Sequence, residues 1–400
     1  MVPNGWKEEE LGNMARFISG GTPNRATTKY WNGDIPWLSA KDMKTFWLSD
    51  SQEKVTEAGA KNGTTSVPAG SILVLVRGMT LMKNVPVGVT TRLVTFNQDV
   101  KALLPIESVR ADFLGYAIVA SKRVLMSYVD QAGHGTGRMP TELLREHVIF
   151  VPPLPEQRAI ATILATWDRA IEQTTRLIEA KRRLKQGLMQ QMLTGKLRFP
   201  VFNCNWEHKK IGDLVRESRD LASSPDMNTR ITVKLNLKGI EKREIRIRED
   251  GTTYYIRRAG QFIYGKQNLH KGAMGLVPDE LDGYESSQDI PAFDFLGECI
   301  PEWFLYFMSR ESFYTNLETI AKGTGSKRIH PSDLNKIPVH VPSISEQREI
   351  AECLGNLDHE IKLHKELLDN FKTQKQALMQ KLLTGQVRVK VEEEDKANAL

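Results

Sequence analysis

The strongest constraint on this 400-residue chain is a segment that occurs twice. Residues 156–195 begin with Glu-Gln-Arg and end with Thr-Gly, and residues 346–385 do the same. The copies stay in step without a gap, because 346 minus 156 and 385 minus 195 both equal 190. The run Leu-Met-Gln at 188–190 accordingly recurs at 378–380. Such a repeat indicates a duplicated architecture, which has to be explained before any other feature.

Each copy predicts one long helix. Its apolar residues recur at alternating steps of three and four, which lays an apolar stripe along one helix face. Ser343 stands three residues before Glu346, the spacing of a capping box, and Gly195 and Gly385 stand where left-handed caps would end the helices. We expect the first part of the stripe to pair the helices through Ile160, Leu164, Trp167, Ile171, Ile350, Leu354, Leu357 and Ile361.

A helix of roughly 40 residues is about 60 Å long, so its apolar stripe needs a partner to cover it. We expect the two copies to pair with each other in antiparallel fashion, related by a pseudo-twofold axis. Polar residues that interrupt the stripe, such as Lys185 and Lys375, are typical of positions that set the register of a helix pair. The alternative is that each helix packs separately on its own domain.

The predicted fold class is α+β, with two mixed α/β domains joined and spaced by two long helices that pair as in a coiled coil. The repeat sets the expected boundaries, because what lies outside the two copies must form the domains. The expected order is domain 1 over residues 1–150, a central helix over 151–198, domain 2 over 199–341, a C-terminal helix over 342–390 and an acidic tail over 391–400.

The two domains share a plan but differ in content. In domain 1 we expect strands over 71–76 and 85–94, a helix over 111–129 and a flexible basic loop over 133–138. The landmarks that recur in domain 2 are Trp6 with Trp206, Leu11-Gly12 with Ile211-Gly212, and Gly70 with Gly260. The remaining side chains differ widely, so the duplication keeps the frame and changes the loops.

Motifs that would indicate catalysis are missing from the sequence. It has no GxxxxGK[ST] phosphate loop, no GxGxxG motif between a strand and a helix, and no GxSxG nucleophile elbow. The three cysteines are far apart and the eight histidines form no pair at helical spacing, which predicts a reducing compartment and no metal site. No apolar stretch resembles a signal peptide or a membrane span. We therefore expect no catalytic residue and no metal ligand.

A binding function remains. The net charge of +6 permits a polyanionic partner, and DNA recognition needs Lys and Arg for phosphates with Asn, Gln, Arg, Ser or Thr for base edges. Loops on a rigid scaffold are where such side chains tend to lie, although each could equally be a solvated surface residue. The candidate DNA-binding residues are Thr22, Asn24, Arg25, Lys29, Arg77, Lys83, Asn84, His134, Arg138, Lys266, Gln267, Asn268, His270, Lys271, Lys322, Ser326, Lys327 and Arg328.

Two variable domains alternate here with two similar helices that carry PLPEQRAIA…LMQQMLTGKL and SISEQREIA…LMQKLLTGQV. This arrangement, which covers essentially the whole chain, resembles the specificity subunit of a type I restriction–modification enzyme. The opening GGTPNRATTKYWNGDIPWLSAKD is similar to the start of a target-recognition domain in that family.

The resemblance implies a non-catalytic, cytoplasmic subunit of a bacterium or archaeon. Each target-recognition domain would read half of a bipartite double-stranded DNA sequence, while the helices set the spacer and dock two methyltransferase subunits. Restriction subunits would join through the methyltransferase subunits, and no membrane would be involved. No cofactor is expected on this chain: S-adenosylmethionine would bind the methyltransferase subunits, and ATP and Mg would bind the restriction subunits. The alternatives are a duplicated protein-binding scaffold and a stand-alone DNA-modifying enzyme with an unrecognised active site.

Overall fold

A computed structural model describes residues 2–132, 135–222, 227–243, 252–323 and 327–390 of the chain. The acidic tail predicted over 391–400 therefore lies outside the described residues. The chain forms two compact units, and each is described by itself below. Unit 1 contains Met1–Thr174 and Leu367–Leu400, and unit 2 contains Thr175–Glu366. Each unit thus combines one predicted domain with half of each long helix.

The elements of unit 1 are short strands and helices followed by the start of a long helix. In chain order they are β1 (Lys7–Glu10), α1 (Leu11–Met14), β2 (Ala15–Ser19), η1 (Thr28–Tyr30), β3 (Trp31–Leu38), β4 (Trp47–Leu48), β5 (Glu53–Val55), α2 (Glu57–Lys61), β6 (Thr65–Val67), β7 (Ile72–Leu75), β8 (Arg77–Gly78), η2 (Met79–Met82), β9 (Val87–Thr90), β10 (Val94–Phe96), β11 (Val100–Pro105), α3 (Ala111–Ala120), α4 (Lys122–Ser127), β12 (Asp130–Ala132), β13 (Thr136–Arg138), α5 (Thr141–Arg145), β14 (Val148–Val151) and α6 (Leu154–Met192).

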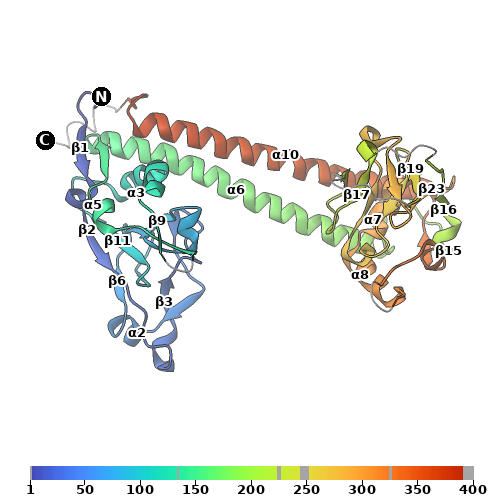
Figure 1. Cartoon of the computed structure of the whole chain (residues 1–400), viewed down its shortest axis with the longest axis horizontal. Coiled ribbons are helices and arrows are strands. Elements are labelled where there is room, and N and C mark those ends of the chain that lie inside the picture. Colours follow the sequence, from blue (N-terminus) through green and yellow to red (C-terminus); the bar gives the residue numbers. More distant parts are fainter. Residues whose placement is uncertain (1, 133–134, 223–226, 244–251, 324–326, 391–400) are drawn as a thin grey trace. The chain divides into compact units, whose positions relative to one another are not determined.

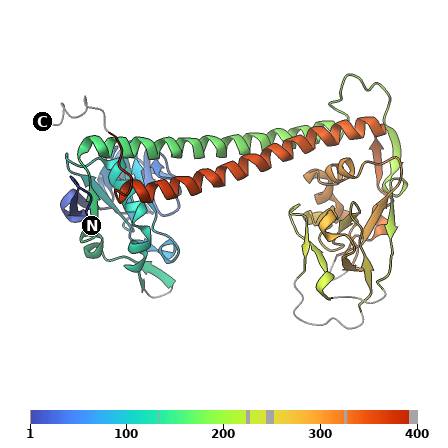
Figure 2. The same cartoon turned by 90° about the horizontal axis from the view of Figure 1, so that it is seen from above.

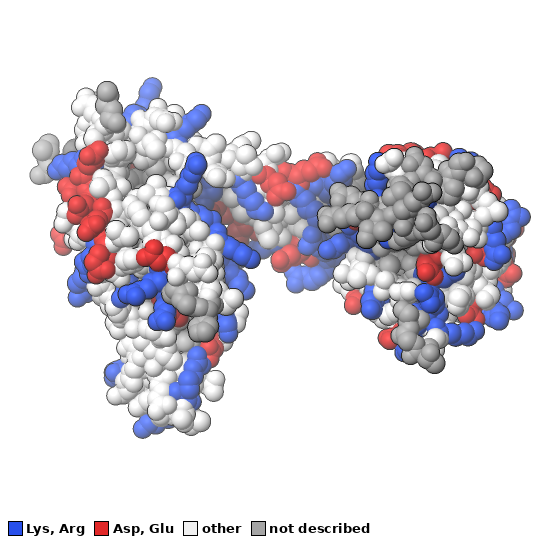
Figure 3. Space-filling model, viewed as in Figure 1, with Lys and Arg blue, Asp and Glu red and all other residues white. Residues whose placement is uncertain are grey.

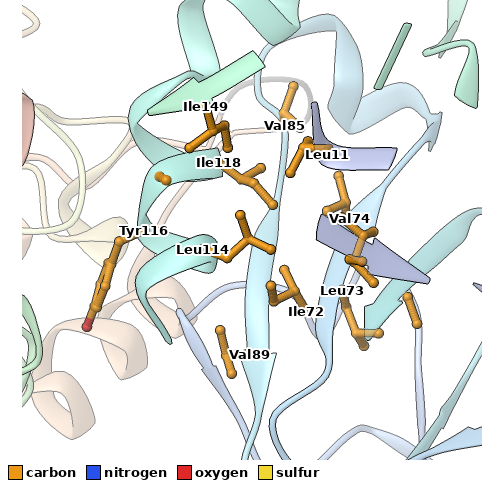
Figure 4. Packing of buried hydrophobic residues seen from close by; sticks show 14 of the residues in the cluster. Leu11, Ile72, Leu73, Val74, Val85, Val89, Leu114, Tyr116, Ile118 and Ile149 are labelled. Carbon is orange, nitrogen blue, oxygen red and sulfur yellow. The ribbon is translucent and has the colours of Figure 1, made fainter. Parts of the chain in front are cut away.

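The core of unit 1 lies between helix α3 and the five-stranded sheet β2-β11-β7-β9-β4. Strand β7 reads Ile-Leu-Val-Leu and is fully buried, as a continuous apolar run predicts for a central strand. In Figure 4, Leu114 and Ile118 of α3 point toward Ile72 and Val74, whereas Tyr116 lies on the opposite side of the helix. Each fully buried aliphatic side chain contributes about 1.5–3 kcal/mol, so this cluster supplies much of the stability of the unit.

Unit 2 repeats this plan with shorter strands. Its elements are β15 (Glu207–Lys210), η4 (Ile211–Asp213), β16 (Val215–Ser218), η5 (Met227–Thr229), β17 (Ile231–Val233), β18 (Ile240–Lys242), β19 (Tyr254–Ile256), β20 (Phe262–Tyr264), η6 (Leu269–Lys271), β21 (Met274–Leu276), η7 (Asp279–Leu281), β22 (Glu285–Ser287), β23 (Ala292–Phe295), α7 (Pro301–Met308), α8 (Glu311–Tyr314), η8 (Thr315–Ile320), α9 (Pro331–Leu334), β24 (Pro338–Val341) and α10 (Ile344–Leu383). The sheet β16-β23-β20-β21 packs under helix α7, where Phe262, Phe293 and Phe304 are fully buried.

Both predicted long helices are present, as α6 and α10. Gly195 and Gly385 follow them with φ angles of 71° and 69°, so the predicted left-handed caps are confirmed. The predicted capping box is only half formed. Ser343 Oγ accepts a hydrogen bond from the Glu346 backbone N–H at 3.3 Å, but the Glu346 carboxylate binds elsewhere.

Within each unit the two helices run antiparallel. In unit 1 the start of α6 lies beside the end of α10, as Figures 1 and 2 show, and Trp167 meets Phe371 edge-on at 5.7 Å between ring centroids. In unit 2 the second half of α6 meets the first half of α10, where Lys181 pairs with Glu360 and Lys185 with Asp358. Partner numbers on α10 fall as numbers on α6 rise, which is the antiparallel arrangement that the sequence predicts.

The expected pairing stripe divides between helix contacts and domain contacts. Ile160 and Leu164 are buried in the unit 1 core together with Met379 and Leu382 of α10. Ile350 and Leu354 are buried in the unit 2 core with Met192 of α6 in the same way, and Ile361 is buried as well. Trp167, Ile171 and Leu357 are half-buried. The start of each helix is therefore inserted between its domain and the end of the other helix.

Three local predictions for domain 1 need correction. Of the predicted flexible loop over 133–138, residues 133 and 134 lie outside the described residues. Thr136–Arg138 form strand β13, which pairs with β12 and, through Gly137 and Arg138, with β8. The predicted helix over 111–129 is broken at Ser121 into α3 and α4. The predicted strand over 85–94 is interrupted: it contains β9, a turn and the first residue of β10. Among the described helices, none has both the length and the apolar content that a membrane span requires.

Candidate nucleic-acid interface

A buried carboxylate at the start of α6 joins three parts of unit 1. Glu156 accepts two hydrogen bonds from Arg388, at 2.7 Å from Nε and 2.8 Å from Nη2, and a third from Trp6 Nε1 at 3.1 Å. Its side chain is only 6% exposed. The hydrogen bonds to this carboxylate raise the pKa of Arg388, so the guanidinium keeps its charge at any physiological pH.

Unit 2 contains the same arrangement. Glu346 accepts two bonds of 2.8 Å from Arg198 and one of 3.1 Å from Trp206 Nε1. Arg198 and Arg388 are separated along the chain by the same offset as the two glutamates. The Glu of each Glu-Gln-Arg repeat, at the start of one long helix, therefore binds a Trp of its domain and an Arg from the segment that follows the other long helix. We call each Glu–Arg–Trp arrangement a clamp.

The repeated Gln satisfies three backbone groups that would otherwise be unpaired. Gln157 Oε1 accepts from the backbone N–H of Arg110 at 2.8 Å, and Nε2 donates to the carbonyl oxygens of Ser108 and Pro152 at 3.1 and 2.9 Å. In unit 2 Gln347 makes the corresponding bonds to Ile300, Glu298 and Pro342. Since buried backbone groups need partners, this residue fixes the angle at which the helix leaves the domain.

A tyrosine on α3 and its counterpart on α7 complete the two junctions. Tyr116 donates to Asp168 of α6 at 2.6 Å, and Lys375 of α10 binds the same carboxylate. Burial is the main cause that raises the pKa of Tyr116, followed by its hydrogen bond to Asp168, so the phenol stays protonated as a donor. Tyr306, Asp358 and Lys185 repeat this triad in unit 2. Each domain is thus attached rigidly to its half of the helix pair.

The structure separates the predicted DNA-binding residues into two groups. Several already have partners inside their own domain, which gives them a structural role. Arg25 forms an ion pair with Glu53 and lies 4.0 Å above the Trp31 ring. The other engaged residues are Thr22 with Gln98, Asn24 with the Ala26 N–H, Lys29 over Tyr30, Lys322 with Asp333, Lys327 with Glu318, and Arg328 with Asp289. His134 and Ser326 lie outside the described residues.

The second group has no such partners. Within the described part of the chain, these side chains form no hydrogen bond or ion pair: Arg77, Lys83, Asn84, Arg138, Lys266, Gln267, Asn268, His270 and Lys271. They come from corresponding places in the two domains, namely the segment around η2 in domain 1 and the segment around η6 in domain 2, with β13 beside the first. Their donors and acceptors are not used by the described part of the chain, although the Nδ1 of His270 is buried.

In domain 1 two of these cations lie directly opposite each other. Arg77 of β8 pairs with Arg138 of β13 in the antiparallel ladder, and both side chains are exposed. Like charges at directly opposed positions are destabilising, and an anion bound between them would remove this repulsion. A hollow of about 460 Å³ lies beside them, and Gln98 and Lys101 also line it. Lys101, which donates to Ser19 Oγ at 2.6 Å, was not among the predicted residues.

Domain 2 differs at the matching positions. Arg328 corresponds to Arg138 at the offset of the repeat, but Asp289 lies 3.3 Å from its Nε at an angle that gives no hydrogen bond. Burial lowers the pKa of Lys266, although nearby carboxylates oppose this shift. His270 has a buried Nδ1 without a hydrogen-bond partner among the described residues. This surface is therefore less positive than that of domain 1 and richer in amide and imidazole groups.

Acidic and basic side chains are distributed differently on the visible face of unit 1. In Figure 3 its acidic side chains lie mostly toward the edge that carries β1, and Lys and Arg are spread over the remaining surface. The described residues contain no cluster of three or more His, Cys, Asp or Glu that could hold a metal ion.

Sequence reasoning missed Arg198, Arg388, Tyr116 and Tyr306 as functional positions. The sequence contains a signal for them, because Arg198 and Arg388, like Tyr116 and Tyr306, are separated by the same 190 residues as the two copies of the helical repeat. Extending the comparison beyond the Glu-Gln-Arg and Thr-Gly boundaries would have found both pairs.

Comparison with known proteins identifies the family. A family described as the type I restriction modification DNA specificity domain matches residues 3–182 and 203–372, once for each half of the duplication. The chain therefore belongs to this family, as the resemblance predicts. It is a DNA target-recognition component of a type I restriction–modification system, and neither the scaffold nor the stand-alone enzyme is favoured.

Individual relatives agree with this assignment. The chain is 30% identical over 183 residues to the EcoR124I/EcoR124II specificity subunit of Escherichia coli, a match that covers 45% of each chain. It is 24% identical to the MjaIX specificity subunit of Methanocaldococcus jannaschii, covering 97% of this chain and 95% of that one. The crystal structure of a type I restriction–modification S subunit from M. genitalium has the same fold, with a TM-score of 0.59 at 14% identity over 96% of this chain and 97% of that one.

Proposed function

We propose that each domain of this chain reads one half of a bipartite DNA target, and that the paired helices set the unread spacer. The observation that carries this proposal is that the junctions between domain and helices are repeated, whereas the exposed polar side chains of the domains are not. The Glu, Gln and Asp–Tyr–Lys junctions are the same in both units, whereas the unpaired polar side chains differ. Independent reading of two different sequences requires two domains that are attached to the helices in the same way but expose different side chains.

The paired helices are the proposed docking surface for two methyltransferase subunits, through which restriction subunits join. Support comes from the exposed apolar side chains of the helices, including Leu177 and Leu184 of α6 and Leu363 and Leu367 of α10, which are 42–53% exposed. Apolar side chains left in solvent on a long helix favour a further protein surface. On this proposal the chain itself catalyses no step, and S-adenosylmethionine, ATP and Mg bind the partner subunits.

The test is to exchange domain 1 for that of another family member while keeping the helices. Adenine methylation is then mapped across the genome of a host that expresses the chimera with the methyltransferase subunits. We expect one half of the methylated sequence to change, with the other half and the spacer unchanged. A matched chimera in which only domain 2 is exchanged should alter the opposite half. A change in both halves from either exchange would contradict independent reading.

A further inference from the structure

A short segment of each domain starts at a residue that is held by the same two backbone hydrogen bonds, Val76 in domain 1 and Lys266 in domain 2. In domain 1 the Val76 carbonyl oxygen accepts from Met139 N–H and the Val76 N–H donates to Asp99, at 2.9 and 2.8 Å. In domain 2 Lys266 makes both of these bonds, to Ile329 and Asp289, each at 2.9 Å. All three positions recur at the offset of the helical repeat, so Val76 and Lys266 are the same structural point.

The segment also ends at the same point in both domains. The Thr80 carbonyl oxygen accepts from the N–H of Lys83 at 3.0 Å, and the Asn268 carbonyl oxygen accepts from the N–H of Lys271 at 2.9 Å. The next residue, Leu81 or Leu269, is fully buried in the core of its unit. Thr80 and Asn268 therefore begin equivalent turns, although 268 minus 80 equals 188 and not 190.

Between these fixed points the two domains carry different residues. Domain 1 has three, Arg77, Gly78 and Met79, whereas domain 2 has only Gln267. Gly78 has a φ of 139°, a conformation that favours glycine, and it lets the longer segment pair with β13 before η2 begins. Met79 is 75% exposed, so it can contact a surface that Arg77 binds.

The chemistry of these side chains matches different bases. An arginine reads guanine by donating to O6 and N7 together, whereas a glutamine reads adenine by accepting from N6 and donating to N7. Arg77 and Gln267 have no side-chain hydrogen bond to the described residues, so both keep the donors and acceptors that such contacts need. We propose that this segment is a base-reading element of each domain, with Arg77 recognising a guanine in one half-site and Gln267 an adenine in the other.

The roles of Arg77 and Gln267 rest on the proposed DNA-reading function, and the test distinguishes failure of these roles from failure of that function. The chain and its variants are expressed with the methyltransferase subunits, and the methylated motif is determined for each. Arg77→Gln should relax or change one guanine position in the half-site of domain 1. Gln267→Arg should change one adenine position in the half-site of domain 2. Discrimination at that base pair should fall by about 5- to 150-fold, the range for one bidentate contact. Arg92→Gln is the control, because Arg92 is an exposed arginine of the same domain outside the segment, and its motif should match the wild type.

A second measurement begins with the wild-type complex, so its main result does not depend on how a variant folds. Binding of the wild-type complex is compared on duplexes that carry guanine or 7-deazaguanine, which lacks the N7 acceptor, at each guanine of the domain 1 half-site. One position should weaken wild-type binding, and the Arg77→Gln complex should be indifferent to it. Motifs that stay unchanged in both variants, or an equal loss at every sequence, would overturn the assignment, because an equal loss marks a phosphate contact. Absence of any sequence-dependent methylation or binding by the wild type would instead reject the proposed function.

Discussion

The clamp around Glu156 makes a quantitative prediction about unit 1. Replacing Arg388 with Met removes two of the three hydrogen bonds to a carboxylate that is 6% exposed, and only Trp6 Nε1 remains as a donor. Hydrogen bonds to charged groups contribute about 1.5–3 kcal/mol. Since Arg388 is itself 44% exposed, water can replace part of the interaction, so we expect the free energy of unfolding of unit 1 to fall by about 2 kcal/mol.

Thermal unfolding and hydrogen exchange together measure this change. A loss of about 2 kcal/mol corresponds to a decrease in Tm of about 4–8 °C for a unit of this size. Because the chain has two units, a single transition does not report on one of them alone. Hydrogen-exchange mass spectrometry resolves the location: peptides from the core of domain 1 and the start of α6 should lose protection, while peptides of unit 2 serve as the internal reference.

A double-mutant cycle decides whether the clamp is the cause. In Glu156→Gln/Arg388→Met the buried group is neutral and no longer needs the guanidinium, so the double variant should cost less than the two single variants added together. Arg198→Met, which breaks the matching clamp on Glu346, should lower protection in unit 2 and leave domain 1 unchanged. Strict additivity in the cycle, or loss of protection in the wrong unit, would refute the reasoning.

Further predictions concern single buried groups. Gln157→Leu leaves three backbone groups without their partner and should destabilise unit 1 by about 2–4 kcal/mol, measured by urea unfolding against Gln173→Leu on the exposed face of α6. Burial raises the pKa of Cys299 to about 12, so a thiol reagent at pH 8 should modify exposed Cys204 quickly and Cys299 only on unfolding; equal rates in the native chain would contradict this. Burial lowers the pKa of His147, so it is neutral in the fold and takes up a proton on unfolding in mild acid. Unit 1 should therefore lose stability as the pH falls below the ordinary histidine value of about 6.5, and His147→Gln should show a flatter pH dependence of Tm.

The long helices were predictable because their information is local and repeated. The three-and-four spacing, the terminal glycines and the constant offset between the two copies all point to the same elements, and α6 and α10 confirm them. The capping box at Ser343 was predicted from local spacing as well, yet Glu346 turned instead to Arg198 and Trp206. A buried ion pair between residues far apart in the chain outweighs a local backbone bond, and no local rule contains it.

The candidate interface was predictable by residue type but not by arrangement. Arg25 and Arg77 carry the same signal in the sequence, since both are basic residues near glycines in segments that were expected to be loops. Glu53 and Trp31 engage Arg25, whereas Arg77 is placed opposite Arg138 by the pairing of β8 with β13. Strand β8 is two residues long and its partner is far away in the chain, so the pairing depends on long-range register that the alternation of side chains does not reveal.

Unit 1 is assembled from both ends of the described chain, with Leu382 and Arg388 closing over Ile160 and Glu156, whereas unit 2 is one continuous segment. A ribosome makes domain 1 first, yet it supplies the residues that complete unit 1 only after all of unit 2. During synthesis the apolar face at the start of α6 is therefore exposed until α10 has been made. A product that ends before the last turns of α10 lacks the residues that cover this face. Unit 1 therefore begins first during translation but is completed after unit 2, because its second segment, from Leu367 onward, follows all of unit 2 in the chain.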